Sequence, residues 1–130
     1  LILEGDNNES YGPLPSISPL FGSLSLSYIY KDLKIQSVFK FSDSKDPNEY
    51  SLAGEDGLEE TPFIINQDGI KSFLGAPKWS DLSIYASKKV SSNSTLRLGI
   101  SNIFDIHYRT FASGISAPGR SIQAGLNLKL

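Results

Sequence analysis

Apolar and polar residues alternate without a slip along the last twelve positions of the chain, 119–130. One set of alternate positions holds Ile122, Ala124, Leu126, Leu128 and Leu130. The other set holds Ser121, Gln123, Gly125, Asn127 and Lys129. Because successive side chains of a β-strand point to opposite faces, this pattern predicts a strand with one apolar and one polar face.

Four earlier segments show the same period of two. The pattern predicts strands at residues 22–30, 33–42, about 79–90, and 95 to about 108. Ser37 and Val38 are exchanged relative to strict alternation, and Tyr85 falls among the polar positions. No segment has a convincing helical period, so the chain is expected to be all-β.

The connections between the predicted strands alternate in length. Residues 31–32 and 91–94 are short links, whereas 43–78 and 109–118 are long ones. Transmembrane β-barrels place short turns at one end and long loops at the other, which favours an antiparallel transmembrane β-barrel segment. Alternation alone leaves a second interpretation open, in which the apolar face covers the core of a soluble β-domain. The apolar runs are too short for a membrane-spanning helix.

Aromatic residues gather near both expected ends of the strands. Tyr28 and Tyr30 lie near one end, and the opposite end carries Phe41, Trp79, Tyr108 and Phe111. Two such bands are typical of the girdles at the two membrane interfaces.

Composition narrows the function classes. The 130 residues make one domain or part of one. The net charge of −2 lacks the excess of positive charge that is typical of nucleic-acid-binding proteins. The chain has no Cys, so we expect neither a disulfide framework nor a thiolate metal site. It also has no Met, and its first ten residues do not look like a signal peptide, so we interpret it as a piece of a longer or processed protein.

Four motifs in order resemble those of one family. Asn102-Ile103-Phe104-Asp105-Ile106-His107-Tyr108 resembles the Asn-Leu-Phe-Asp-x-x-Tyr signature near the end of TonB-dependent outer-membrane receptors. Ala117-Pro118-Gly119-Arg120 then precedes the final strand, as in that family. Upstream, the segment from Gly12 to Pro19 resembles the family's Pro-rich loop, and Glu59-Glu60-Thr61-Pro62 resembles its Glu-x-x-Thr-Pro stretch. The chain departs from the family by ending in Leu130 rather than an aromatic residue. It also has a long spacing before Trp79, which we interpret as an insertion around 66–74.

The resemblance implies an outer-membrane protein of a Gram-negative bacterium, with a barrel of twenty-two strands plugged by an N-terminal domain. Residues 1–130 would supply about five C-terminal strands, and the plug and the earlier strands would be absent. Such a receptor takes up a scarce nutrient, such as siderophore-bound iron, haem, cobalamin, a glycan or a peptide. The TonB–ExbB–ExbD complex drives uptake through the plug, and membrane lipid surrounds the barrel. The alternatives are a soluble β-domain that binds a protein or carbohydrate, and a porin or adhesin barrel independent of TonB.

We expect the motif residues to be structural rather than ligand-binding: Asn102, Phe104, Asp105, Tyr108, Gly119 and Arg120. Asn102 and Asp105 are expected to permit a bend near the rim, and Arg120 to cap the loop against Asp105. Phe104 and Tyr108 are expected to anchor at the interface, and Gly119 to allow a tight entry into the last strand. The nutrient is expected at the outer loops, 43–78 and 109–118.

The remaining chemistry is sparse. The first long loop holds the carboxylates Asp43, Asp46, Glu49, Glu55, Asp56, Glu59 and Glu60. They suit either a cation site or a solvated loop, and we favour the solvated loop. His107 is the single histidine and is expected at the surface, since alone it makes no typical zinc or haem site. Residues 66–69 form a turn signal. With no nucleophile–base pair in the pattern, we expect no enzyme, no cofactor and no metal.

Overall fold

The computed structural model describes residues 6–7, 10–51, 54 and 56–129. These residues divide into two units. We define the sheet unit as the described residues of Gly22–Phe41, Ser80–Tyr108 and Ala117–Leu130. The loop unit comprises the described residues of Leu1–Phe21, Ser42–Trp79 and Arg109–Ser116. No helix in the described ranges is long and apolar enough to cross a bilayer.

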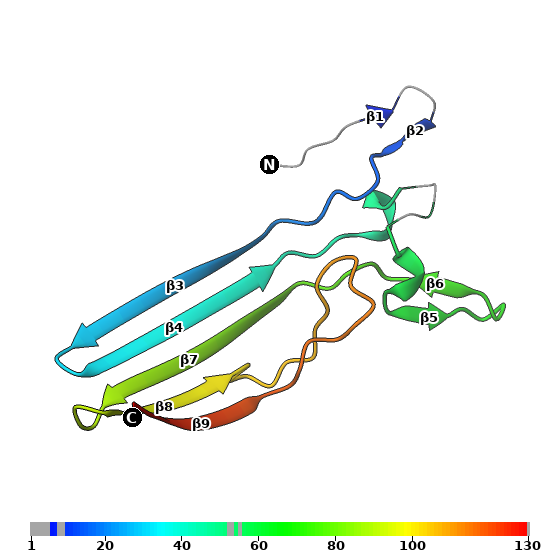
Figure 1. The fold of residues 1–130 in the computed structure, drawn as a ribbon. Helices are drawn as coiled ribbons and strands as arrows, with labels where there is room; N and C mark the ends of the chain where they lie inside the picture. Colours follow the sequence, from blue (N-terminus) through cyan, green and yellow to red (C-terminus); the bar gives the residue numbers. More distant parts are fainter. Residues whose placement is uncertain (1–5, 8–9, 52–53, 55, 130) are drawn as a thin grey trace. The chain divides into compact units, whose positions relative to one another are not determined.

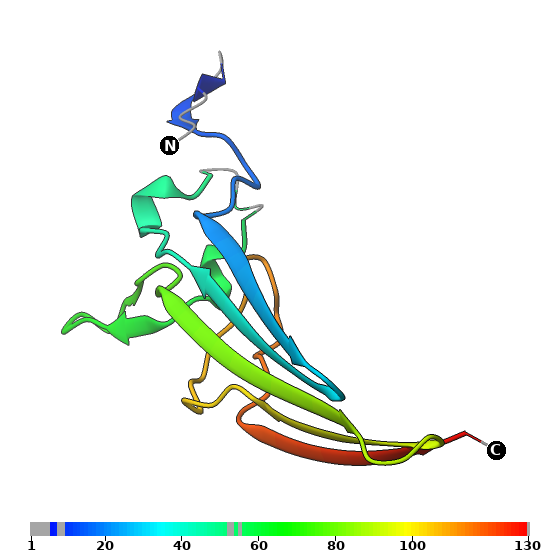
Figure 2. The same ribbon diagram turned by 90° about the vertical axis from the view of Figure 1, so that its left-hand side faces the viewer.

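The sheet unit is built on one antiparallel sheet of five strands in the order β3-β4-β7-β8-β9 (Figure 1). The strands are β3 (Phe21–Tyr30), β4 (Leu33–Ser42), β7 (Trp79–Lys89), β8 (Ser94–Ser101) and β9 (Ser121–Leu128). Strands that follow each other in this order along the chain are neighbours in the sheet, which forms a single layer (Figure 2). The prediction of an all-β, antiparallel fold is confirmed. The sheet is open, since β3 and β9 have no outer neighbour among the described residues.

The connections alternate in length as expected. Tight turns join β3 to β4 and β7 to β8, whereas 43–78 joins β4 to β7 and 102–120 joins β8 to β9. All the short turns therefore leave one end of the antiparallel sheet, and the long connections leave the other.

The predicted fourth strand was too long. It was expected to reach about Tyr108, but β8 ends at Ser101. Asn102 and Asp105 have φ of 49° and 54°, in the left-handed region that a strand cannot pass through. The closing strand is also shorter than predicted, and Leu130 lies outside the described residues.

The apolar face of the sheet is left uncovered by the described residues. Leu26 is 63% exposed, Leu98 51%, Leu126 58% and Ile122 79%, and even Ile35 is 37% exposed. Among the described residues, the one buried apolar side chain is Tyr50, which lies in the loop unit. A soluble domain of this length would bury such a face in a core, because apolar surface in water is unfavourable. The described sheet therefore depends on an apolar surrounding that the described chain does not supply.

The loop unit has its own short elements. It contains β1 (Asp6–Asn7), β2 (Ser10–Pro13), β5 (Phe63–Ile65), β6 (Lys71–Phe73) and two 3-10 helices, η1 (Pro47–Glu49) and η2 (Leu58–Glu60). β5 and β6 form a hairpin, and its turn is the predicted one at 66–69. There the Asn66 N–H donates to the Ile70 carbonyl oxygen at 2.9 Å, and Gly69 has φ of 75°. The segment that the sequence marked as an insertion thus forms the turn and the second strand of this hairpin.

A buried lysine organises the loop unit. Lys45 is 3% exposed, and its Nζ lies 3.4 Å from Oδ2 of Asp56. The same ammonium donates to the Ile17 carbonyl oxygen and lies 4.8 Å and 4.5 Å from the ring centroids of Tyr50 and Phe111. We call Lys45, Asp56, Tyr50 and Phe111 the Lys45 nucleus. It ties together three segments that are distant in the sequence.

The nucleus corrects the expectation that the carboxylates of this loop are solvated. Asp56 is 4% exposed, whereas Asp43, Asp46, Glu49, Glu59 and Glu60 are exposed; Glu55 lies outside the described residues. Burial alone would raise the pKa of Asp56. The N–H donors of Ser16 and Ser51 and the charge of Lys45 outweigh it and lower that pKa. Asp56 is therefore a charged, fully bonded group of the loop interior.

Phe111 also differs from its expected place. The aromatic pattern assigned it to an interfacial girdle, but its ring lies 6.2 Å from the Tyr50 ring and against the Lys45 ammonium. It belongs to the interior of the loop unit, because a cation and an aromatic ring are favourable neighbours once both are withdrawn from water.

We predict that Lys45→Met destabilises the loop unit by about 3–5 kcal/mol, since removal of one partner leaves a buried carboxylate without its cation. Limited proteolysis of the full-length protein is expected to give faster cleavage within 43–62. Lys78→Met is the matched control, because Lys78 is an exposed lysine of the same unit. Equal cleavage rates for the two variants would contradict this role of Lys45.

The stability of the loop unit is expected to depend on pH through Asp56. A carboxyl with a lowered folded-state pKa contributes stability that is present above its unfolded-state value and lost as the pH falls through the folded-state value. Hydrogen exchange of residues 45–51 should therefore keep its protection from neutral pH down to about the ordinary value of 3.8, and lose it below. In Asp56→Asn this acid-dependent loss should be absent.

Candidate functional site

The end of β8 is closed by a clasp built on Asn102. This residue is buried, with 3% of its surface exposed. Its Nδ2 donates to the carbonyl oxygens of Ile106 at 2.8 Å and Pro118 at 3.1 Å, and its Oδ1 accepts from the Ile106 N–H at 3.0 Å. Asparagine suits this place because it tolerates a left-handed backbone and carries both a donor and an acceptor. The clasp holds the turn after β8 against the segment that leads into β9.

The expected contact between Arg120 and Asp105 is present. Oδ1 of Asp105 accepts a hydrogen bond from the Arg120 backbone N–H at 2.7 Å, and the guanidinium lies 3.8 Å from Oδ2. The two side chains are about half exposed, so their ion pair contributes little, and the backbone hydrogen bond is the stronger constraint. A Cβ on Gly119 would lie 3.0 Å from Oδ1 of Asp105, which leaves little room for a side chain.

The other motif residues lie outside this clasp. Phe104 is 60% exposed, and His107 is exposed as expected. Tyr108 directs its hydroxyl to Oδ2 of Asp81 at 3.5 Å, and burial together with the Asp81 charge raises the pKa of Tyr108. The structure thus brings together Asn102, Asp105, Gly119 and Arg120 in one clasp, and it gives Tyr108 a separate partner.

The two loops expected to bind the nutrient meet within the loop unit. Arg109 donates from Nε to Oγ of Ser116 at 3.1 Å, and from Nη1 to the Glu60 carbonyl oxygen at 3.3 Å. Phe111 adds its contact with Tyr50. Residues 109–116 are therefore fixed against the first long loop. In the described part of the chain, no group of three acidic, histidine or cysteine residues is placed to hold a metal ion.

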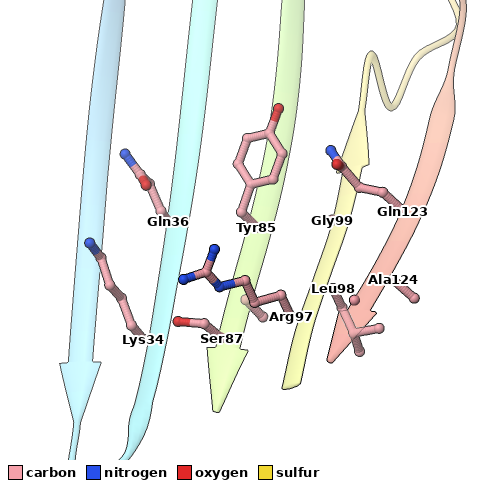
Figure 3. Close-up of a pocket in the computed structure, with 11 residues that line it drawn as sticks. Lys34, Gln36, Tyr85, Ser87, Arg97, Leu98, Gly99, Gln123 and Ala124 are labelled. Carbon is pink, nitrogen blue, oxygen red and sulfur yellow. The ribbon is translucent and has the colours of Figure 1, made fainter. Parts of the chain in front are cut away.

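The polar face of the sheet holds a hollow that sequence reasoning missed. Its volume is about 520 Å³, and polar side chains of β4, β7, β8 and β9 line it (Figure 3). The main ones are Lys34, Gln36, Tyr85, Ser87, Arg97 and Gln123. Alternation had placed Tyr85 on the polar side, which the hollow confirms. The grouping itself depends on the strand register, which pairs Ser87 with Arg97 and sets Gly99 between Tyr85 and Gln123. The alternation pattern of a single strand does not specify the register between strands.

Comparison with known proteins finds a similar fold among solved structures. No family model and no curated protein matches the chain. Among solved structures, the chain is similar to the copper transporter OprC, with a TM-score of 0.68 and 21% sequence identity. The match covers 95% of this chain. The chain spans 18% of the length of that transporter. At this level of identity the likeness establishes the fold, which is that of a section of a much longer transporter.

We predict that the clasp is needed for folding rather than for ligand contact. Asn102→Asp keeps the acceptor for the Ile106 N–H but sets an oxygen against two carbonyl oxygens. Each lost buried hydrogen bond of this kind costs about 1–3 kcal/mol. The yield of folded, protease-resistant full-length protein should fall strongly in Asn102→Asp and only slightly in Asp105→Ala. Normal yield in Asn102→Asp would contradict this structural role.

Proposed function

We propose that this chain is the C-terminal part of the barrel of a TonB-dependent outer-membrane receptor, which takes up a scarce nutrient in a Gram-negative bacterium. The observation that carries the proposal is the two-faced sheet, with an exposed apolar face backed by a polar one. In a large transmembrane barrel the first face meets lipid and the second lines the lumen. The ordered family motifs and the fold shared with a section of a transporter support the same assignment.

The open sheet supports further strands in the complete protein. Five strands cannot close around a lumen, and unpaired edges such as those of β3 and β9 are unfavourable when left free. In the proposed receptor, earlier strands of the same polypeptide pair with both edges. The plug that precedes them engages TonB, which works with ExbB and ExbD.

The nutrient is proposed to bind at the loops 43–78 and 109–118, because the loop unit fixes them against each other. We do not propose copper, which the similar transporter carries, as the nutrient of this chain. The chain has neither Cys nor Met, and sulfur ligands of this kind are those that copper(I) favours. We propose no enzymatic activity, because uptake through such a barrel needs binding and movement rather than covalent chemistry.

We predict that Leu26→Arg is poorly tolerated and Ser27→Arg is tolerated. These are neighbouring positions of β3 on opposite faces of the sheet, with Leu26 on the apolar one. An arginine on the lipid face near the middle of a barrel costs about 2–4 kcal/mol, whereas lumen positions accept charge. The measurement is the amount of folded full-length protein in the outer-membrane fraction.

The outcomes separate the alternatives. Full-length protein that stays monodisperse without detergent would support a soluble β-domain and end the proposal. A barrel in the outer membrane with no plug domain encoded upstream would indicate a porin or adhesin. Loss of uptake in a TonB-deficient strain, with normal barrel assembly, is the result expected for the receptor.

A further inference from the structure

Two glycines of neighbouring strands, Gly99 of β8 and Gly125 of β9, shape the hollow on the polar face of the sheet. A Cβ on Gly125 would meet nothing within 4 Å. A Cβ on Gly99 would instead lie 2.7 Å from Cδ1 of Tyr85 and 3.0 Å from Cγ of Gln123. Gly99 is therefore what allows the Tyr85 ring and the Gln123 side chain to approach across β8 and wall the hollow. Its volume of about 520 Å³ falls within the range of small-molecule sites.

The hollow carries two positive charges without a counter-charge. Lys34 of β4 and Arg97 of β8 both line it, and no carboxylate does. Neither cation forms an ion pair within the described part of the chain. In Figure 3 the guanidinium of Arg97 extends over β7 in the direction of β4, the strand of Lys34. Like charges that line one hollow repel each other, and an anion held in the hollow would relieve the repulsion.

Neutral hydrogen-bonding groups complete the lining. Gln36 donates to Oγ of Ser25 at 3.0 Å, which fixes its amide at the wall. Tyr85 and Gln123 also line the hollow, and Ser87 adds a hydroxyl side chain beside Arg97. A planar guanidinium, an ammonium and neutral N–H and O–H donors together match the two oxygens of a carboxylate.

We propose that the Lys34–Arg97 hollow binds a carboxylate group. This inference rests on the proposed function in one respect, since it takes the polar face to border the interior of a larger barrel. Two sources share that chemistry: an acidic side chain from another part of the same polypeptide, and a carboxylate of a solute that passes along the wall. Either one neutralises the two cations.

The test uses the detergent-solubilised full-length protein, with citrate as the carboxylate probe and sodium chloride at equal ionic strength as its control. Lys34→Gln, Arg97→Gln and the double variant are compared with Lys88→Gln, which removes a lysine of β7 at an apolar-face position. If the carboxylate comes from a solute, citrate raises the midpoint temperature of thermal unfolding of the protein without substitutions. The double variant should then weaken citrate binding at least tenfold, and Lys88→Gln should not.

If the carboxylate is an internal side chain, citrate has no effect and Arg97→Gln lowers the thermal midpoint while Lys88→Gln leaves it unchanged. A double variant with the same midpoint and the same citrate response as the unchanged protein overturns the inference. Should the double Gln variant fail to fold, Lys34→Arg with Arg97→Lys keeps both charges. Folding of that variant supports the need for charge, and its failure, with citrate inert, counts against the inference. The proposed function is tested separately by recovery of the protein in the outer-membrane fraction.

Discussion

The constraint on which this fold depends is the need to keep one face of a single-layer sheet away from water. Leu26, Leu98 and Leu126 are exposed, and the described residues form no second layer that covers them. The free energy that holds such a sheet in place must therefore come from its surroundings and from the backbone hydrogen bonds between the strands. In the proposed outer-membrane receptor a bilayer would supply those surroundings, and it would penalise any unpaired backbone group.

The two units distribute apolar and charged side chains in opposite ways. The sheet unit exposes apolar side chains on one face and gathers polar ones around a hollow on the other, whereas the loop unit buries a charge. The Lys45 nucleus replaces a hydrophobic core that so short a set of loops cannot build. A buried ion pair is a weak source of net stability but a strong source of specificity, because few alternative loop conformations satisfy both Lys45 and Asp56. This explains how long connections keep a defined shape.

The sequence predicted the strands well and the loops poorly, for identifiable reasons. Period-two alternation reports directly on which face a side chain takes, so β4 was located to the residue and Tyr85 was assigned to the correct side. Alternation does not report backbone handedness, so the end of β8 at Ser101, before the left-handed Asn102, was missed. Lys45 looks like any solvated lysine in a polar loop, since its partners Ile17 and Phe111 lie far away in the chain. The hollow was missed for the same reason, because it is formed by side chains on different strands.

The free edges of β3 and β9 have a consequence for handling this polypeptide by itself. They are the two ends of one sheet and differ from each other, so the edge of one copy can add to the opposite edge of the next. Such head-to-tail addition does not close by itself, and it leads to open-ended, fibre-like polymers rather than to a discrete oligomer. Overproduction of residues 1–130 alone is thus expected to yield insoluble material whose growth accelerates with concentration, and a capping strand added to either edge should arrest it.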